Sequence, residues 1–199
     1  MSNIVAIVGR PNVGKSTLFN RLLERREAIV DSTAGVTRDR HYGKSDWNGV
    51  DFTVIDTGGY DVGSDDIFEE EIRKQVQLAV DEATSIIFMV NVEEGLQDID
   101  HEIYNLLRKA NKPLYLVVNK VDSAKEMLAA TEFYQLGVEK YYTLSSATGS
   151  GTGELLDDLV ADFPTTEYKD PFEGLPKITI AGRPNVGKST LTNALLDDN

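Results

Sequence analysis

Short apolar runs alternate along the chain with longer amphipathic stretches. Five of the runs are strand candidates, namely IVAIVG from Ile4, FTVID from Phe52, SIIFMVN from Ser85, LYLVVNK from Leu114 and YYTLS from Tyr141. Four of these five are nearly continuous in Val, Ile, Leu and aromatic residues, as strands covered on both faces are. The amphipathic stretches predict helices at about 15–25, 67–82, 98–110, 123–135 and 152–162. This alternation predicts a three-layer α/β fold with a mostly parallel sheet between helices.

One pair of runs breaks the alternation. HYGKSDW and VDFTVID are separated only by Asn48-Gly49, the dipeptide that most readily forms a two-residue hairpin turn with positive φ at both positions. The sequence therefore predicts one antiparallel strand at an edge of the sheet.

Composition places the chain among ordinary globular proteins. It has 199 residues, of which 41% are hydrophobic and 27% charged. The absence of cysteine excludes disulfides and thiolate metal sites. The N-terminus lacks the pattern of a secretory signal, and no apolar run approaches the roughly 18 residues of a membrane span. We therefore expect a cytoplasmic protein with no membrane partner.

The charge of the chain bears on nucleic-acid binding. The net charge of −13 repels nucleic-acid phosphates on average. Contact with nucleic acid would need a local basic patch, for which the candidates are Arg21, Arg25, Arg26, Arg38 and Arg40. A solvated, salt-bridged surface is the other interpretation of these arginines.

Nearly the same fifteen residues occur twice, as GRPNVGKSTLFNRLL at 9–23 and GRPNVGKSTLTNALL at 182–196. Between them, FPTTEYKDPFEGLP at 163–176 holds three of the six prolines and no apolar periodicity. We expect a first domain over 1–162, a linker over 163–176 and the truncated start of a second domain over 177–199. One strand and one helix cannot bury a core alone. The chain is therefore expected to be a fragment of a longer tandem protein.

The repeated loop fits G-x-x-x-x-G-K-[ST] between a predicted strand and a predicted helix. Backbone N–H groups of such a loop, with the helix N-terminus behind them, surround phosphate oxygens. Lys15 would bring a cation to the β and γ phosphates, and the Ser16 hydroxyl would bind Mg²⁺. A glycine-rich turn with an exposed lysine is the alternative, but two matches in the same context make chance negligible. The expected residues are Gly9, Arg10, Pro11, Asn12, Val13, Gly14, Lys15, Ser16 and Thr17, and in the second copy Gly182, Arg183, Pro184, Asn185, Val186, Gly187, Lys188 and Ser189.

Asn119-Lys120-Val121-Asp122 follows the LYLVVNK strand, at the carboxyl edge where ligands bind in open α/β sheets. The Asp122 carboxylate could accept hydrogen bonds from guanine N1–H and the exocyclic amine, a donor pair that adenine lacks. Alone, N-K-x-D is a weak pattern, and a turn at a strand end is its plain interpretation. Downstream of a phosphate loop, it predicts selection of guanine.

Asp56-Thr57-Gly58-Gly59 lies between these two motifs, where another predicted strand ends. Asp56 would hold Mg²⁺ through water, and the Gly59 N–H would meet the γ-phosphate. Thr37 in GVTRDR is placed to offer a second hydroxyl to Mg²⁺, although an ordinary loop residue is the alternative. We therefore expect Lys15, Thr37 and Gly59 to be catalytic and Ser16, Thr37 and Asp56 to hold Mg²⁺.

With these motifs in this order, the chain resembles the bacterial tandem-domain ribosome-assembly GTPases called Der or EngA. GRPNVGKSTLFN, GVTRDR, DTGGY and NKVD match that family's motifs, and the duplicated GRPNVGKSTL makes the assignment specific. The resemblance covers essentially the whole chain. It implies binding of GTP and GDP, GTP hydrolysis coupled to maturation of the large ribosomal subunit, and a C-terminal RNA-binding-type domain that this chain lacks.

The chain departs from the family pattern at several positions. Ala34 stands where proline is usual in the family, and we expect this to loosen the first switch loop. Ser145-Ser146 stands where the family usually has a Ser-Ala pair whose backbone N–H meets guanine O6. Tyr60 stands where Ras-like enzymes have the glutamine that orients the attacking water. By resemblance, Asn12 helps to bind K⁺ beside the phosphates, which predicts slow intrinsic hydrolysis that K⁺ accelerates.

Two other functions remain open on the sequence. The first is a binding module that holds GTP to set a conformation, with negligible hydrolysis, and Tyr60 favours it. The second is an ATP-dependent kinase or motor, which would need a base site that works without Asp122.

Overall fold

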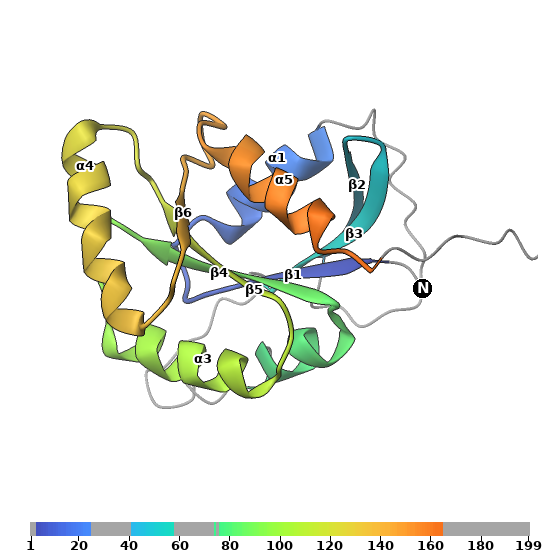
Figure 1. Cartoon of the computed structure of the whole chain (residues 1–199), viewed down its shortest axis with the longest axis horizontal. Helices are drawn as coiled ribbons and strands as arrows, with labels where there is room; N and C mark the ends of the chain where they lie inside the picture. Colours follow the sequence, from blue (N-terminus) through green and yellow to red (C-terminus); the bar gives the residue numbers. More distant parts are fainter. Residues whose placement is uncertain (1–2, 25–40, 58–73, 75, 165–199) are drawn as a thin grey trace, which may run out of the picture. The chain divides into compact units, whose positions relative to one another are not determined.

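The computed structural model describes residues 3–24, 41–57, 74 and 76–164, and these build a six-stranded sheet in the order β2-β3-β1-β4-β5-β6 (Figure 1). The strands are β1 (Ile4–Val8), β2 (His41–Trp47), β3 (Val50–Asp56), β4 (Ser85–Asn91), β5 (Leu114–Asn119) and β6 (Tyr141–Thr143). All pairs are parallel except β2 with β3, which is antiparallel at the edge. Asn48 and Gly49 have φ of 50° and 79° in the connecting turn. The predicted hairpin and the mostly parallel sheet are confirmed.

Helices cover both faces of the sheet. They are α1 (Lys15–Glu24), residues 76–82, α3 (Asp98–Lys109), α4 (Ala124–Ala129), the 3₁₀ helix η1 (Ala130–Leu136) and α5 (Thr152–Ala161). One core cluster joins the sheet to α1 and α5, and a second joins it to 76–82, α3 and η1. Figure 1 shows α1 and α5 on one side of the sheet and α3 on the other. The three-layer α/β fold predicted from the sequence is therefore confirmed.

The helix expected over 123–135 is divided. A capping box between Ser123 and Glu126 starts α4, which ends at Ala129 without burying any side chain. The following η1 turn buries Ala130, Phe133 and Leu136. Their spacing of three matches the three residues per turn of a 3₁₀ helix, so one narrow face meets the core. Gly137 ends the turn with a φ of 77°.

The first compact unit runs from Met1 to Pro164, and Thr165–Asn199 forms a separate unit. Phe163 is buried, with its ring centroid 5.7 Å from that of Phe52. The core therefore includes the first residue of the expected linker, because this aromatic ring packs against Phe52 of β3. The rest of the expected linker and the second copy of the loop lie outside the described residues. Among those described, no helix is both long and apolar enough to cross a bilayer.

Candidate nucleotide-binding site

The loop between β1 and α1 has an unusual backbone. Gly9, Asn12 and Gly14 have φ of 155°, 63° and 102°, and α1 begins directly afterwards at Lys15. The Leu18 N–H donates to the Gly14 carbonyl at 3.0 Å, in the helix pattern. The N–H groups of the first turn have no partners within the helix itself. A loop of this kind at a helix N-terminus suits an anion.

Lys15 lies inside this loop. Its side chain is 7% exposed, and Nζ donates to the Arg10 carbonyl at 2.8 Å. Burial lowers the pKa of Lys15 to about 8, while the charge of Asp56 acts in the opposite direction and that of Arg10 lowers the pKa further. A desolvated ammonium group of this kind is stabilised by an anion brought next to it.

The lowered pKa of Lys15 predicts a pH dependence of stability. The ammonium has a pKa of 10.5 in the unfolded chain and about 8 in the folded one, so the unfolded chain binds more protons between these pH values. The destabilising effect of Lys15 is therefore complete below pH 8 and is lost as the pH rises to 10.5, which raises the free energy of unfolding by about 3 kcal/mol. Denaturant unfolding of the native chain and of Lys15→Met at pH 7.5 and 10 measures this gain. Equal pH slopes in the two proteins would contradict it.

Two oxygen ligands expected for Mg²⁺ lie beside this loop. Ser16 is exposed in the first turn of α1, and Asp56 is 2% exposed at the end of β3, opposite Ile7 of β1. Thr57 Oγ1 donates to the Ile7 carbonyl at 2.9 Å and so fixes the chain after Asp56. No group of three His, Cys, Asp or Glu side chains that could hold a metal occurs in the described part. A hydroxyl and a carboxylate fit the hard Mg²⁺ ion, which keeps waters and takes phosphate oxygens as further ligands.

Several expected site residues lie outside the described ranges. They are Thr37, Gly58, Gly59 and Tyr60, together with Ala34 and the second loop from Gly182 to Ser189. Their expected roles stay predictions.

Asn119 joins the phosphate loop to the loop after β6. Its side chain is 2% exposed. Nδ2 donates to the Val13 carbonyl at 2.7 Å, and Oδ1 accepts from the Ser146 N–H at 2.9 Å. Both ends of the amide are therefore engaged, and the first residue of N-K-x-D holds the two loops in one arrangement.

In the rest of N-K-x-D, Val121 is buried in the core, Lys120 is partly exposed and Asp122 is exposed. Lys120 has a φ of 65° and pairs with Glu93 at 2.9 Å. The Asp122 N–H donates to Glu126 Oε2 at 2.7 Å, whereas the exposed Asp122 carboxylate has no partner among the described residues. The backbone at Asp122 is thus fixed while its carboxylate can accept hydrogen bonds from a ligand. The Val121 N–H donates to the Leu144 carbonyl at 3.1 Å, which brings β6 beside this turn.

Ser146 is buried in the loop between β6 and α5, next to the wholly buried Ser145. Its N–H donates to Asn119, and its carbonyl accepts from Arg21 Nε at 2.5 Å. Ser146 Oγ is the one buried side-chain polar atom without a partner in the described part. Arg21 also donates to the Ala147 carbonyl. This arginine therefore supports the loop between β6 and α5.

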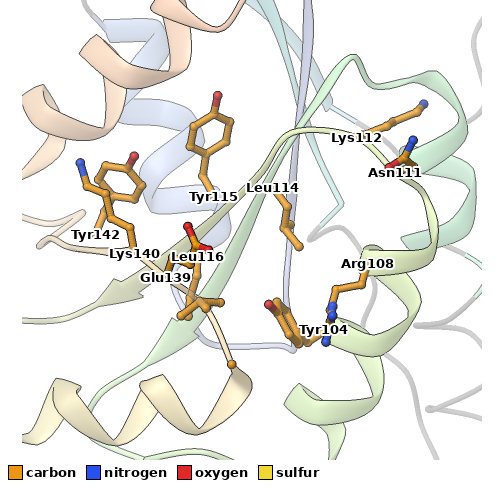
Figure 2. A pocket seen from close by; sticks show the side chains of 12 residues that line it. Tyr104, Arg108, Asn111, Lys112, Leu114, Tyr115, Leu116, Glu139, Lys140 and Tyr142 are labelled. Carbon is orange, nitrogen blue, oxygen red and sulfur yellow. The ribbon is translucent and has the colours of Figure 1, made fainter.

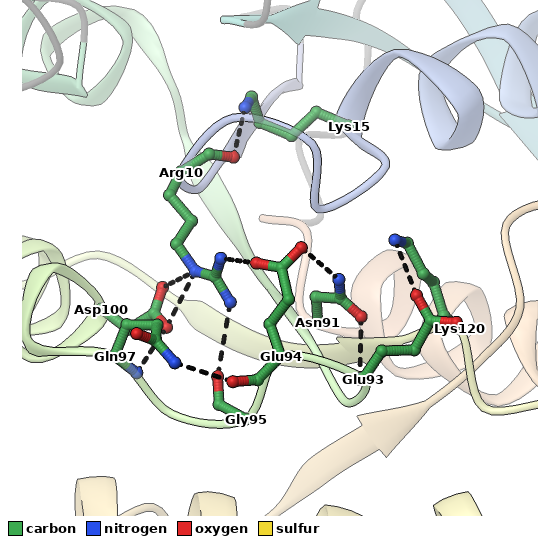
Figure 3. Close-up of polar contacts among 9 residues, drawn as sticks. All are labelled: Arg10, Lys15, Asn91, Glu93, Glu94, Gly95, Gln97, Asp100 and Lys120. Carbon is green, nitrogen blue, oxygen red and sulfur yellow. Dashed lines mark hydrogen bonds and ion pairs between the residues drawn. The ribbon is translucent and has the colours of Figure 1, made fainter. Parts of the chain in front are cut away.

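A group of polar residues beside the phosphate loop was not predicted from the sequence (Figure 3). The Arg10 guanidinium, 8% exposed in the whole residue, donates through Nε to both oxygens of Asp100 at 3.1 Å and also contacts Glu94 and the Gly95 carbonyl. Burial raises the pKa of Asp100, whereas the hydrogen bond from Arg10 holds the pKa of Glu94 below its usual range. Asp100 Oδ2 accepts the Gln97 N–H at 3.1 Å. The three-residue spacing of Gln97 and Asp100 was a signal for this helix start, but no local signal indicates the pairing with Arg10.

A separate pocket of about 470 Å³ lies between α3 and the starts of β5 and β6 (Figure 2). The opposite, carboxyl edge of the sheet carries the loops described above. Of the pocket cations, Lys112 donates to the carbonyls of residues 80, 81 and 83, and Lys140 pairs with Glu154 and Asp158. Arg108 lies over the Tyr104 ring, 5.8 Å from its centroid. Because the pocket lies at the other edge of the sheet from the phosphate loop, it does not form part of the nucleotide site.

Comparison with known proteins agrees with this geometry. A family model described as 50S ribosome-binding GTPase matches residues 4–120 and 177–199. The chain is 62% identical over 198 residues to GTPase Der of Christiangramia forsetii, and 63% identical over 196 residues to GTPase Der of Flavobacterium johnsoniae. These matches cover 100% and 98% of this chain and 45% of each relative. The chain thus spans less than half the length of these relatives.

Solved structures of GTP-binding domains share the fold. A variant of Aquifex aeolicus Era bound to GDP·AlF₄⁻ aligns with a TM-score of 0.66 at 31% identity, over 89% of this chain and 62% of that one. The G domain of the T. maritima FeoB iron transporter aligns with a TM-score of 0.58 at 26% identity, over 81% and 98%. An Era structure with MgGDPNP and a segment of 16S ribosomal RNA aligns with a TM-score of 0.66 at 31% identity, over 89% of this chain and 59% of that one. Since the family model covers more than half of the chain, including the phosphate loop and Asn119, the chain belongs to the 50S ribosome-binding GTPase family.

Proposed function

We propose that this domain binds and hydrolyses GTP as one G domain of a tandem GTPase that acts in assembly of the large ribosomal subunit. The observation that carries the proposal is the double contact of Asn119, at 2.7 Å to the phosphate loop and 2.9 Å to the loop after β6. A site for phosphates and a site for a base are thereby built as one unit at the carboxyl edge of the sheet.

The described residues have distinct roles in this proposal. The loop of Gly9 to Thr17 surrounds the phosphates, and Lys15 leaves the Arg10 carbonyl to meet them. Ser16 and Asp56 would hold Mg²⁺, which neutralises charge on the phosphate oxygens when it is bound. Asp122 accepts from guanine, and Asn119, Lys120 and Val121 build the turn that presents it.

The remaining residues take the roles expected from the sequence, and of these Thr37, Gly58, Gly59 and Tyr60 lie outside the described ranges. Thr37 offers a second hydroxyl to Mg²⁺, the Gly59 N–H meets the γ-phosphate, and Thr57, Gly58 and Tyr60 complete that loop. Ser145 and Ser146 close the guanine side, where the Ser146 N–H would donate to guanine O6 as well as to Asn119 Oδ1. We expect one nucleotide to bind at the first loop.

We further propose that K⁺ activates hydrolysis through Asn12. This side chain is exposed in the loop, where Asn12 has a backbone φ of 63°. A cation bound there would stabilise negative charge that develops on the phosphates. We expect single-turnover hydrolysis of GTP with Mg²⁺ to be about tenfold or more faster in KCl than in NaCl, and Asn12→Ala to remove the difference.

The same measurement tests the alternative function. Equal rates in the two salts, with Asn12→Ala also unchanged, would refute the role of K⁺. Tight GTP binding with no detectable turnover in either salt would favour a binding module without hydrolysis, consistent with Tyr60 in place of glutamine. Hydrolysis of ATP at a similar rate would favour a kinase or motor.

The large ribosomal subunit, or its precursor, is the partner that we propose for the full-length protein. The family description and the similarity to GTPase Der support this proposal. A ribosomal partner would place the protein in the cytoplasm. Co-sedimentation of the full-length protein with large subunits, in GTP and in GDP, would test it.

A further inference from the structure

Residues 91–95 connect β4 to the start of α3 and belong to none of the nucleotide-binding motifs. We name these five residues and Asp100 the β4 brace. Asn91 and Asp100 are wholly buried, whereas the Glu93 and Glu94 side chains are 58% and 45% exposed. Figure 3 shows the brace below the phosphate loop, with Arg10 pointing down into it and Lys120 reaching it from the other side.

At one end the brace holds Arg10. The Arg10 guanidinium donates through Nε to Asp100, through Nη1 to Glu94 and through Nη2 to the Gly95 carbonyl. The backbone carbonyl of the same arginine accepts the Lys15 ammonium at 2.8 Å. A guanidinium fixed by two carboxylates leaves its own backbone little freedom. The position of the phosphate loop is therefore tied to the brace through a single residue.

At the other end the brace holds the N-K-x-D turn. Glu94 Oε1 accepts from Asn91 Nδ2 at 3.0 Å, and Asn91 Oδ1 accepts the Glu93 N–H at 3.0 Å. Glu93 Oε2 then accepts from Lys120 Nζ at 2.9 Å. The Val92 N–H donates to the Asn119 carbonyl at 3.2 Å. A continuous series of hydrogen bonds thus runs from the phosphate loop to the base-recognition turn.

We propose that the β4 brace is a positioning element of the nucleotide site, which sets the phosphate loop through Arg10 and the guanine-binding turn through Lys120. The inference rests on the proposed binding of guanine nucleotides. The two ends of the brace act on different parts of the site. Glu94 positions the phosphate loop, which holds the β-phosphate, and Glu93 positions the N-K-x-D turn, which holds the base. Such couplings between contacting groups change affinity without direct contact to the ligand.

The comparison of GDP with GMP separates the two ends, since GMP lacks the β-phosphate. Affinities are measured by competition against a fluorescent GDP analogue with Mg²⁺ at neutral pH. We expect Glu94→Gln to lower the affinity for GDP by on the order of tenfold and the affinity for GMP by less than about threefold. Because the Glu93–Lys120 pair is exposed, Glu93→Gln should weaken both nucleotides equally, by roughly two- to fivefold.

Asp98→Asn is the matched control. Asp98 is an exposed acid in the first turn of α3, outside the brace, and no contact links it to the site. Both affinities should therefore be unchanged. Asp100→Asn is unsuitable as a probe, because it would leave a buried guanidinium short of its partner and could unfold the chain. Denaturant unfolding of each variant reports its stability independently of binding.

The results separate the possible failures. If Glu94→Gln binds GDP as Asp98→Asn does, or weakens GMP as much as GDP, the brace does not position the phosphate loop. If Glu93→Gln changes the ratio of the two affinities, the series of contacts does not act on the base end. Absence of GDP binding by the native chain would instead refute the proposed function.

Discussion

Replacing Asp122 by asparagine is expected to reverse the base preference of the site, lowering the affinity for GDP by on the order of 10³-fold. A carboxylate accepts hydrogen bonds from both guanine N1–H and the exocyclic amine. The amide of asparagine keeps one acceptor and puts a donor opposite the exocyclic amine, so one hydrogen bond is lost and two donors face each other. Xanthine has an oxygen in place of that amine, and Asp122→Asn should therefore bind xanthosine diphosphate.

The structure makes this substitution a clean test. The Asp122 carboxylate is exposed and without a partner among the described residues, while its N–H is held by Glu126 at 2.7 Å. Ser123 and Glu126 cap the next helix without using the carboxylate. Losing the charge should therefore change the free energy of unfolding by no more than about 0.5 kcal/mol.

Calorimetric titration with GDP, xanthosine diphosphate and ADP measures the switch. The native chain should bind GDP at one site and show no heat with ADP. Asp122→Asn should prefer xanthosine diphosphate. A variant that retains its preference for GDP would show that another group selects the base.

The sheet could be predicted from the sequence because its signals are local. Buried parallel strands need continuous apolar runs, and Asn48-Gly49 forms its turn through the φ preferences of the two residues alone. The break at Ala130 could not be predicted in the same way. The choice between α and 3₁₀ geometry depends on whether Phe133 and Leu136 fit the core together, which is a tertiary property. The burial of Phe163 depends on Phe52 in the same manner.

The motifs of the site could be predicted, but not what holds them. Lys15 and Asp122 are recognised because phosphate and guanine chemistry require those residue types at those positions. Arg10 was expected only to line the phosphates, and its partners Glu94 and Asp100 lie far along the chain. No periodicity or local spacing reports such a pairing, because it arises only when β1 and β4 lie side by side. The same holds for Arg21 and the Ser146 carbonyl.

Gly14→Ala should have the second large effect, on both nucleotide binding and stability. A Cβ atom at this position would lie 2.2 Å from Asn119 Nδ2, and the φ of 102° is one that alanine rarely adopts. Asn119 cannot move aside freely, because its amide is bonded to Val13 and to Ser146. Strain and the loss of these buried hydrogen bonds together should lower the free energy of unfolding by about 3 kcal/mol or more.

Gly137→Ala separates strain from collision. Gly137 has a φ of 77° but no heavy atom within 4 Å of an added Cβ. Alanine there should cost only the strain of the left-handed backbone, about 1 kcal/mol, and should leave GDP affinity unchanged. Denaturant unfolding and GDP titration of both variants test the comparison, and similar results for the two would show that the collision with Asn119 has no consequence.

The double variant Gly14→Ala with Asn119→Ala identifies the cause. Truncating Asn119 removes the atom that the new Cβ would meet, so the double variant should be more stable than the sum of the two single effects. The double variant should still bind GDP about 100-fold or more weakly than the native chain does, because no side chain then joins the phosphate loop to Ser146. Recovered stability without recovered affinity would show that Asn119 acts on the nucleotide through the alignment of the two loops, rather than through the stability of the domain.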